Sequence, residues 1–484
     1  MLNDYKSKIV SLNLKSKPIF DVNDHFKYTN DWRGQYNGDA IAVLKPQDKE
    51  EISKIFKFAN DNQISVVPQG GNTGLCGGAT PIKNSLSVII STEKMNRILS
   101  IDKQSMIITV EPGVILSVIH DEVEKNNLFF PLSLGAKGSC TIGGNLSTNA
   151  GGINVLKYGN TRELCLGLEI VLPNGEIMNM LKVLKKDNTG YDLKNLFIGA
   201  EGTLGIITAA TMKLFAKPKL NITAFVEAMT IKNAIKLLNL FQDELNNELE
   251  AFELMPKVFW EVASNNIENI SIPFNKIPQM GVLLELATTS TVDTSLNLNG
   301  TTNLGDKLEN LLSKALEKGL IEDAIICKNE LEKKSLWEIR ESAAENEKKE
   351  LEKSKAKKCL KHDISLPIHN IDQFHLDAQK MISSKLDGTR TIYFGHLGDG
   401  NLHYNVFGNG KGEDGFENFS QEITENLYRI INTLNGSFSA EHGIGQLKKN
   451  NLKNFKDPIT YKMMTNLKKI IDPNNIMNPG KIFI

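Results

Sequence analysis

Two glycine-rich segments in the first third of the chain limit what it can fold into more than any other feature. Residues 64–81, ISVVPQGGNTGLCGGATP, lead from a β-branched run directly into five glycines mixed with small polar residues. Residues 133–160, SLGAKGSCTIGGNLSTNAGGINVLKYGN, repeat this composition over a longer segment. Because glycine has no Cβ, the backbone N–H groups of such loops can surround one anion closely. Either loop alone is typical of tight turns, but the two together predict a cradle for a diphosphate.

The segments around these loops alternate between strand-like and helix-like patterns. This alternation over 39–217 predicts a mixed α/β domain, with strands at 40–46, 64–71, 85–91 and 106–113 and helices at 50–63 and 114–126. At Lys217–Pro218 the pattern changes to long amphipathic segments and short strands, such as 280–288 and 390–396, which predicts a domain boundary. The charge-dense segment 328–361 predicts a solvated helix. A helix over 461–471 and a docked tail are expected at the end of the chain.

Composition excludes several classes of function. Fifty-six Lys and Arg against 57 Asp and Glu give a net charge of −1, so the overall charge does not favour binding to nucleic acid or an anionic membrane. The five cysteines contain no Cys-x-x-Cys pair, which favours a reducing compartment. Uncharged runs near the start are too short for a signal peptide or a membrane span. We therefore expect a cytoplasmic protein without a transmembrane segment, and leave open a peripheral association with the inner membrane.

Three histidines fall in two short motifs, FGHLGDGNLHYN at 394–405 and SAEHGIG at 439–445. A hairpin over the first motif would bring His396 and His403 together, with Asn405 on the same face as His403. Adding Glu441 gives a His/His/carboxylate set that suits Zn²⁺ or Mn²⁺ and leaves coordination positions open for catalysis. The alternative is a pair of hairpin histidines satisfied by hydrogen bonds and an unrelated surface glutamate.

A further nucleotide-binding pattern occurs at Gly410–Gly415, where GKGEDG matches G-x-G-x-x-G. Glu413 and Asp414 would place two negative charges where a pyrophosphate should lie. A polar surface loop is the better interpretation.

Three segments together carry a family resemblance. PQGGNTGL at 68–75, GSCTIGGNLSTNAGG at 138–152 and TGYDLKNLFIGAEGTLGIITAATMKLFAKP at 189–218 resemble the FAD-binding domain of the vanillyl-alcohol oxidase and p-cresol methylhydroxylase flavoproteins. Within that family the chain is most similar to FAD-linked D-2-hydroxyacid dehydrogenases of the D-2-hydroxyglutarate dehydrogenase type. The resemblance implies an α+β fold: an FAD-binding domain at 1–218, a substrate-binding cap domain with an antiparallel sheet at 219–437, and a C-terminal helical segment at 438–484 that returns to the flavin.

The resemblance also implies the residues that contact FAD. They are Pro68, Gly70, Gly71, Asn72, Thr73, Gly74, Leu75, Gly138, Ser139, Thr141, Gly143, Gly144, Asn149, Gly151, Gly152, Glu201, Gly205, Ile207 and Asn478. Some family members attach the flavin through a histidine near the position of Asn72, and an amide cannot form that bond. We therefore expect FAD to be bound non-covalently.

The same resemblance assigns roles in the second half of the chain. His396, His403 and Glu441 match the metal ligands, and His442 matches the catalytic base, which also faces the substrate. Arg340 and Lys361 match substrate-binding cations, and with Asn405 they would bind the substrate carboxylate. Ala344 departs from the pattern, because 2-hydroxyglutarate enzymes have a threonine there. This difference leaves the choice between 2-hydroxyglutarate, lactate and related acids open.

The expected function is therefore FAD-dependent oxidation of a small D-2-hydroxy acid to the 2-oxo acid. A hydride would pass to flavin N5 while a divalent metal, Zn²⁺ or Mn²⁺, assists deprotonation of the hydroxyl group. A separate electron-transfer flavoprotein, quinone or cytochrome would reoxidise the flavin, and a homodimer is left open. Two alternatives are an FAD subunit of a glycolate oxidase-type complex and a metallohydrolase acting on a phosphorylated substrate.

Overall fold

The structure of the chain is a computed structural model that divides into two compact units. Unit 1 comprises 1–152, 158–217 and 441–484, and unit 2 comprises 153–157 and 218–440. The described residues are 2–268, 270, 273–274, 276–298, 300–353, 358–385, 388–408 and 413–484, without the side chains of 413–415 and 417–418. Residues 410–412 of the GKGEDG motif lie outside the described residues, and 413–415, predicted as part of a surface loop, are instead the first residues of helix α15 (Glu413–Thr433).

Unit 1 contains a small parallel sheet with the strand order β1-β3-β2. Its strands are β1 (Ala42–Leu44), β2 (Ser65–Gln69) and β3 (Ser87–Ser91). Helix α3 (Lys49–Asn62) connects β1 to β2, and the side chain of Asp48 caps it by accepting a hydrogen bond from the backbone N–H of Glu51. Because β2 ends at Gln69, the first glycine-rich loop starts at the carboxyl edge of this sheet.

A second sheet in unit 1 is antiparallel and has the strand order β4-β5-β9-β7-β8. The strands are β4 (Ile98–Asp102), β5 (Ile107–Val110), β7 (Cys165–Val171), β8 (Ile177–Met180) and β9 (Ile206–Lys213), and β6 (Leu128–Phe129) pairs separately with β10 (Phe215–Ala216). Its core joins apolar side chains of these strands to those of α4 (Leu116–Glu124) and α5 (Ile142–Thr148). The second glycine-rich loop contains α5, so a packed core holds this loop in place.

Further helices lie in the N-terminal part of the chain. They are α1 (Leu2–Ser11), α2 (Val22–Thr29), α6 (Val155–Tyr158), α7 (Thr161–Leu164) and α8 (Lys194–Phe197).

The last 44 residues return to unit 1 as α16 (Lys449–Phe455), α17 (Pro458–Ile471) and an extended tail. The tail lies along β2: the backbone N–H of Val66 donates to Ile476 (2.7 Å) and that of Asn478 donates to Val66 (2.8 Å). The ammonium group of Lys468 donates to the carbonyl oxygens of Thr203 (2.8 Å) and Met477 (2.7 Å) and pairs with Asp472. These contacts attach the end of the chain to the sheet that carries the first glycine-rich loop.

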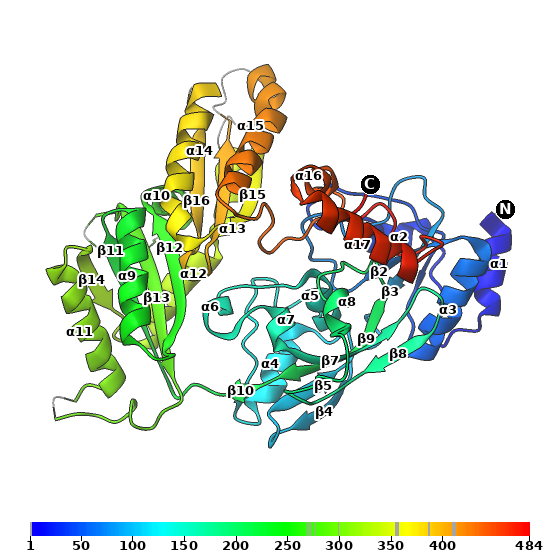
Figure 1. Cartoon of the computed structure of the whole chain (residues 1–484), viewed down its shortest axis with the longest axis horizontal. Helices are drawn as coiled ribbons and strands as arrows, with labels where there is room; N and C mark the ends of the chain where they lie inside the picture. The colour runs from blue at the N-terminus through cyan, green and yellow to red at the C-terminus, as the bar shows by residue number, and fades with distance from the viewer. Residues whose placement is uncertain are drawn as a thin grey trace. The chain divides into compact units, whose positions relative to one another are not determined.

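Unit 2 is built on a seven-stranded antiparallel sheet with the order β14-β11-β13-β12-β16-β17-β15 (Figure 1). Its strands are β11 (Leu220–Ala228), β12 (Leu249–Pro256), β13 (Met280–Thr288), β14 (Ile321–Ile326), β15 (Cys359–Ser365), β16 (Arg390–His396) and β17 (Asn401–Phe407). The helices are α9 (Ile231–Glu244), α10 (Lys257–Asn266), α11 (Asn303–Glu317), α12 (Glu330–Glu341), α13 (Ala343–Lys353), α14 (Ile371–Lys385) and α15 (Glu413–Thr433). Together with unit 1 this confirms the predicted α+β class.

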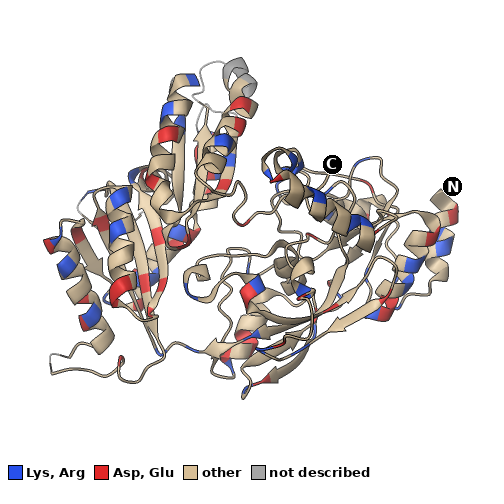
Figure 2. Ribbon diagram, viewed as in Figure 1, with Lys and Arg blue, Asp and Glu red and all other residues tan. Residues whose placement is uncertain are grey.

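Two segments differ from their sequence-based descriptions. The charge-dense segment 328–361, predicted as one helix, contains helices α12 and α13 and the first residues of β15. Most of its described charges are exposed, but Arg340 and Glu347 are buried. Helix α17 begins at Pro458, three residues before the predicted start, because Asp457 caps it and proline fits the first helical position. Figure 2 shows both signs of charge interspersed along α9, α11 and α14, in agreement with the net charge of −1.

Candidate functional site

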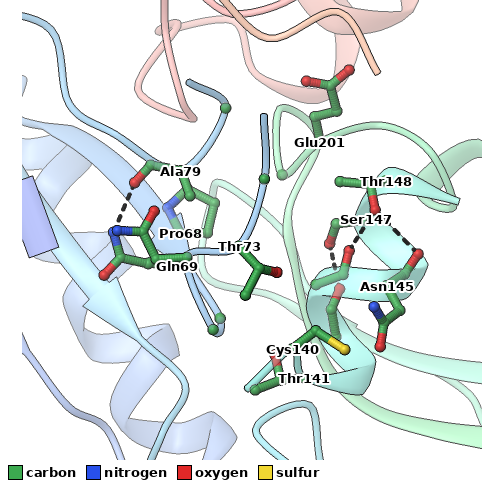
Figure 3. Close-up of a pocket in the computed structure, with 18 of the residues that line it drawn as sticks. Pro68, Gln69, Thr73, Ala79, Cys140, Thr141, Asn145, Ser147, Thr148 and Glu201 are labelled. Carbon is green, nitrogen blue, oxygen red and sulfur yellow. Dashed lines mark hydrogen bonds between the residues drawn. The ribbon is translucent and has the colours of Figure 1, made fainter. Parts of the chain in front are cut away.

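Unit 1 contains a cleft of about 910 Å³, including the part open to solvent. This size is in the range of small-molecule and cofactor sites. Figure 3 shows Pro68 and Gln69, at the end of β2, on the opposite side of the view from Ser147 and Thr148 of α5. The predicted cofactor residues that line the cleft are Pro68, Gly70, Gly71, Asn72, Thr73, Gly74, Leu75, Thr141, Gly143, Gly144, Glu201, Gly205 and Ile207.

The two glycine-rich loops pack directly against each other. A Cβ atom on Gly70 would collide with the hydroxyl oxygen of Thr141, and a Cβ on Gly71 would collide with the carbonyl oxygen of Ser139. Only glycine allows this close approach of backbones. Asn72 follows with a φ of 52°, and its amide group donates to the carbonyl oxygen of Asn30 (2.8 Å).

Two buried polar atoms of the second loop mark the wall of the cleft. Thr141 Oγ1 and Asn145 Oδ1 have no hydrogen-bond partner among the described residues. Buried polar atoms are normally satisfied, so atoms left without a partner beside a cleft indicate a ligand that supplies one. A glycine-lined cleft with such atoms fits a diphosphate-containing cofactor such as FAD.

Glu201 connects this wall to the C-terminal segment that carries His442. Its carboxylate accepts hydrogen bonds from the backbone N–H groups of Ile444 (2.7 Å) and Gly445 (2.8 Å). Burial raises the pKa of Glu201, and these two hydrogen bonds oppose that effect. His442 itself lines the cleft. A residue from the last tenth of the chain is therefore part of a site built mainly from the first half.

Six predicted cofactor residues do not line the cleft: Gly138, Ser139, Asn149, Gly151, Gly152 and Asn478. Asn478 instead donates to the carbonyl oxygens of Gly78 (2.9 Å) and Glu201 (2.9 Å) and so fastens the tail to the loops. Direct contact of these six with FAD stays a prediction.

The sequence reasoning also missed lining residues. Most of them neighbour the predicted ones, but Thr92 directly follows β3, and Pro112 is the second residue after β5. Their position after a strand was the only signal that could have identified them.

In unit 2, β16 and β17 form the predicted hairpin, which carries both histidines of the first motif. The rings of His396 and His403 lie 6.0 Å apart between centroids. His403 Nδ1 is 3.8 Å from a carboxylate oxygen of the buried Asp363. In the turn between the strands, burial raises the pKa of Asp399 to about 6.

The predicted substrate-binding residues of unit 2 are each held by a buried carboxylate. Arg340 pairs with Glu253, which lies 2.7 Å from Nε and 2.6 Å from Nη2. Lys361 and Asn405 are register partners on β15 and β17, and both donate to Glu347, with 3.0 Å for the lysine. Sequence reasoning identified neither glutamate.

Glu253 also contacts His396, with 2.6 Å between Oε1 and Nδ1. Burial opposes ionisation of Glu253, but the charges of His396 and Arg340 and their hydrogen bonds outweigh it and lower its pKa to about 2. Glu253 is therefore a carboxylate at neutral pH.

Glu441, the third predicted metal ligand, lies where the chain leaves unit 2. The backbone N–H of Ala440 donates to Asp363 (3.3 Å), and Glu441 is the first residue of the C-terminal part of unit 1. Ala344 is exposed on α13.

None of the helices that the structure describes is long and apolar enough to span a membrane.

Two family models match the chain. One is described as FAD binding domain and matches residues 40–181, and the other, FAD linked oxidases, C-terminal domain, matches residues 217–482. Among solved structures, p-cresol methylhydroxylase with substrate bound has a TM-score of 0.75 at 15% identity, covering 100% of this chain and 96% of that one. A 4-ethylphenol oxidase from Gulosibacter chungangensis has a TM-score of 0.73 at 17% identity, covering 100% and 97%.

Curated relatives are considerably more similar in sequence. The mitochondrial D-2-hydroxyglutarate dehydrogenase of Arabidopsis thaliana is 36% identical, covering 97% of this chain and 80% of that protein. The D-2-hydroxyglutarate dehydrogenase of Xanthomonas citri pv. viticola is 31% identical, covering 98% and 95%. A putative D-lactate dehydrogenase of Schizosaccharomyces pombe is 34% identical, covering 95% and 85%. The chain therefore belongs to the FAD-linked oxidase family, in the group of flavoproteins that includes the D-2-hydroxyglutarate dehydrogenases.

Proposed function

We propose that this chain is an FAD-dependent dehydrogenase that oxidises a small D-2-hydroxy acid, such as D-2-hydroxyglutarate or D-lactate, to the 2-oxo acid. The observation that carries the proposal is the glycine-lined cleft of unit 1, which has His442 on its wall. The names of the relatives agree with this substrate class. Membership of an FAD-linked family favours this function over a metallohydrolase.

FAD would be held by the two glycine-rich loops and by the buried Thr141 and Asn145. Asn72 cannot form the covalent bond that a histidine makes in related flavoproteins, and its amide already donates a hydrogen bond to the carbonyl oxygen of Asn30. The flavin is therefore dissociable. When bound, FAD supplies the acceptor for the electron pair of the substrate Cα–H bond.

His442 would take the proton of the substrate hydroxyl group. A neutral imidazole has an unperturbed pKa of about 6.5, so it can accept a proton near neutral pH. The hydrogen bonds from Ile444 and Gly445 to Glu201 hold the segment that carries His442 beside the cleft. The proton leaves to His442, and the electron pair leaves with the hydrogen of Cα, which balances a two-electron oxidation.

His396, His403 and Glu441 would bind the divalent metal, Zn²⁺ or Mn²⁺. Two imidazoles and a carboxylate are ligands that these ions accept. Glu441 is bonded to Ala440, so its Cα lies about 3.8 Å from a residue that is fixed beside β15. A bound metal would stabilise negative charge on the substrate hydroxyl oxygen.

Arg340, Lys361 and Asn405 would orient the substrate carboxylate. Arg340 offers a planar fork and Lys361 a point charge. The buried partners Glu253 and Glu347 restrict their movement. Tight positioning matters, because a displacement of about 1 Å can cost roughly a hundredfold in rate.

The electrons would leave to a separate carrier: an electron-transfer flavoprotein, a cytochrome, or a quinone at the inner membrane. We place the protein in the cytoplasm, since no disulfide joins any of the five cysteines among the described residues. A homodimer is compatible with this scheme.

The test is anaerobic mixing of the purified yellow protein with D- and L-2-hydroxy acids, before and after treatment with a chelator. We expect a D-2-hydroxy acid to bleach the flavin, and the chelator to slow bleaching without releasing the flavin. A flavin that none of the acids reduces would refute the function.

Acid precipitation should leave the flavin in the supernatant, and flavin in the pellet would contradict non-covalent binding.

A further inference from the structure

One buried carboxylate in unit 2 connects two parts of the proposed site. Glu253 is in the middle of β12 and has no exposed surface. It is the register partner of His396 at the short junction where β12 pairs with β16. Its Oε1 lies 2.6 Å from His396 Nδ1, and its Oε2 lies 2.7 Å from Arg340 Nε. The two oxygens of one side chain thus contact a predicted metal ligand and a predicted substrate-binding cation.

We propose that Glu253 is a positioning residue that sets the orientation of both His396 and Arg340, and so couples metal binding to substrate binding. The proposal rests on the proposed function, because it uses the roles assigned there to His396 and Arg340. Glu253 acts only through these two residues.

The contact with His396 determines which ring nitrogen can serve the metal. A carboxylate accepts hydrogen bonds, so His396 donates from Nδ1 and carries its proton there. When His396 is neutral, this leaves the lone pair on Nε2, the ring nitrogen that does not face Glu253. This is the carboxylate–histidine arrangement that orients metal-binding imidazoles and makes them more basic.

The contact with Arg340 fixes the plane of the guanidinium group. Glu253 lies on its Nε and Nη2 edge, and the guanidinium carbon lies 5.0 Å from the centre of the Phe394 ring. The hydrogen bond at Nε and the ion pair at Nη2 restrict the direction from which a substrate carboxylate can approach, and the buried Nη2 itself makes no hydrogen bond among the described residues. The charge of Glu253 also compensates a cation that is almost fully buried.

Replacing the carboxylate by an amide separates the role of the charge from that of the shape. In Glu253→Gln the amide oxygen can accept from Arg340, but the NH₂ group then faces His396 Nδ1. Because NH₂ donates, the imidazole must accept at Nδ1 and move its proton to Nε2, the atom needed for the metal. Loss of such a partner typically weakens metal binding ten- to a hundredfold.

The experiment compares wild type, Glu253→Gln, Glu253→Asp and the control Glu285→Gln. Glu285 is a buried carboxylate on the adjacent strand β13 that binds Thr223 (2.7 Å) and Trp337 (3.1 Å). Zinc affinity is measured on chelator-treated full-length protein by competition with a chromogenic chelator. The KM and kcat of flavin reduction, the flavin content and the far-UV circular dichroism are recorded for each variant.

We expect Glu253→Gln to bind zinc ten- to a hundredfold more weakly and to raise KM for the hydroxy acid, with unchanged flavin content. Glu285→Gln should match wild type, and Glu253→Asp should recover part of the zinc affinity because it keeps the accepting charge. If Glu253→Gln does not fold, the zinc affinity and KM of Glu253→Asp test the proposal instead. Its shorter side chain cannot reach both His396 and Arg340, so at least one of these two values should differ from wild type.

Zinc affinity and KM within threefold of wild type in the decisive variant would overturn the proposal, as would a wild type that binds no zinc. Failure of the proposed function looks different, because then no D-2-hydroxy acid reduces the wild-type flavin. The zinc comparison needs no substrate and decides the proposal in that case as well.

Discussion

The contact between the two glycine-rich loops leads to a sharp prediction for Gly71→Ala. Besides the collision with the Ser139 oxygen, the new Cβ would lie 2.9 Å from the Ser139 carbonyl carbon and 3.0 Å from Cys140 Cα. Carbon atoms pack optimally at about 3.5–4.0 Å, so the loops must separate by at least about 0.5 Å. All three atoms are backbone and cannot rotate away. Overpacking of this kind costs about 1–3 kcal/mol of folding free energy. FAD needs the loops in their closed arrangement, so its binding must supply the same free energy, which corresponds to roughly a 5- to 150-fold loss of FAD affinity.

The assay is titration of flavin-free protein with FAD, together with thermal unfolding of the same samples. Gly135→Ala is the matched control, because it lies in the same second loop and a Cβ there meets nothing within 4 Å. Gly74→Ala is the second comparison, since it lines the cleft but its Cβ would also lie in open space. We expect Gly71→Ala to lose both stability and FAD, Gly74→Ala to lose FAD only, and Gly135→Ala to keep both. A Gly71→Ala protein that binds FAD like wild type would refute the reasoning.

Three further predictions follow from single side chains. His442→Ala should keep its flavin but reduce it about 10²–10⁴-fold more slowly with a D-2-hydroxy acid, measured by stopped flow; an unchanged rate would exclude it as the base. Asp472→Ala leaves the buried Lys468 without its carboxylate and should destabilise the protein by about 3–5 kcal/mol in urea unfolding, whereas a loss under 1 kcal/mol would contradict this. Burial, followed by the charge of Lys449, lowers the pKa of Lys481 to about 8, and the unfolded chain keeps this proton up to about pH 10.4. The free energy of unfolding of the flavin-free wild type should therefore rise between pH 8 and 10. At pH 7, Lys481→Met should be more stable than wild type by up to about 3 kcal/mol, and this difference between the two proteins should shrink as the pH rises.

The family, the α+β class and the FAD-dependent oxidoreductase function could be predicted because the glycine-rich loops are local. Their residues are contiguous in the chain, so composition and order alone indicate the chemistry. The FAD loops at 68–75 and 138–152 both contribute to the cleft for this reason. The hairpin of His396 and His403 was predictable on the same ground, since only six residues separate them.

Residues that act through long-range packing gave no such signal. Glu253 is 143 residues from His396 and 87 from Arg340. The register of β12 against β16 brings it to His396, and Arg340 reaches it from helix α12. Glu347 lies in a helix whose charge density indicates exposure to solvent, yet it is buried against Lys361 and Asn405. A buried carboxylate and an exposed one look alike in sequence until the partner strand is known.

The attachment of Ile476–Asn478 along β2 has a consequence for the biogenesis of the protein. Residues 218–440 form a continuous segment that can fold during translation, before the residues that follow it are made. Unit 1 lacks the segment that lies along β2 until Ile476–Asn478 have been translated, which happens only after residues 218–440 have been made. We therefore expect chains truncated before Ile476 to bind no flavin and to be colourless.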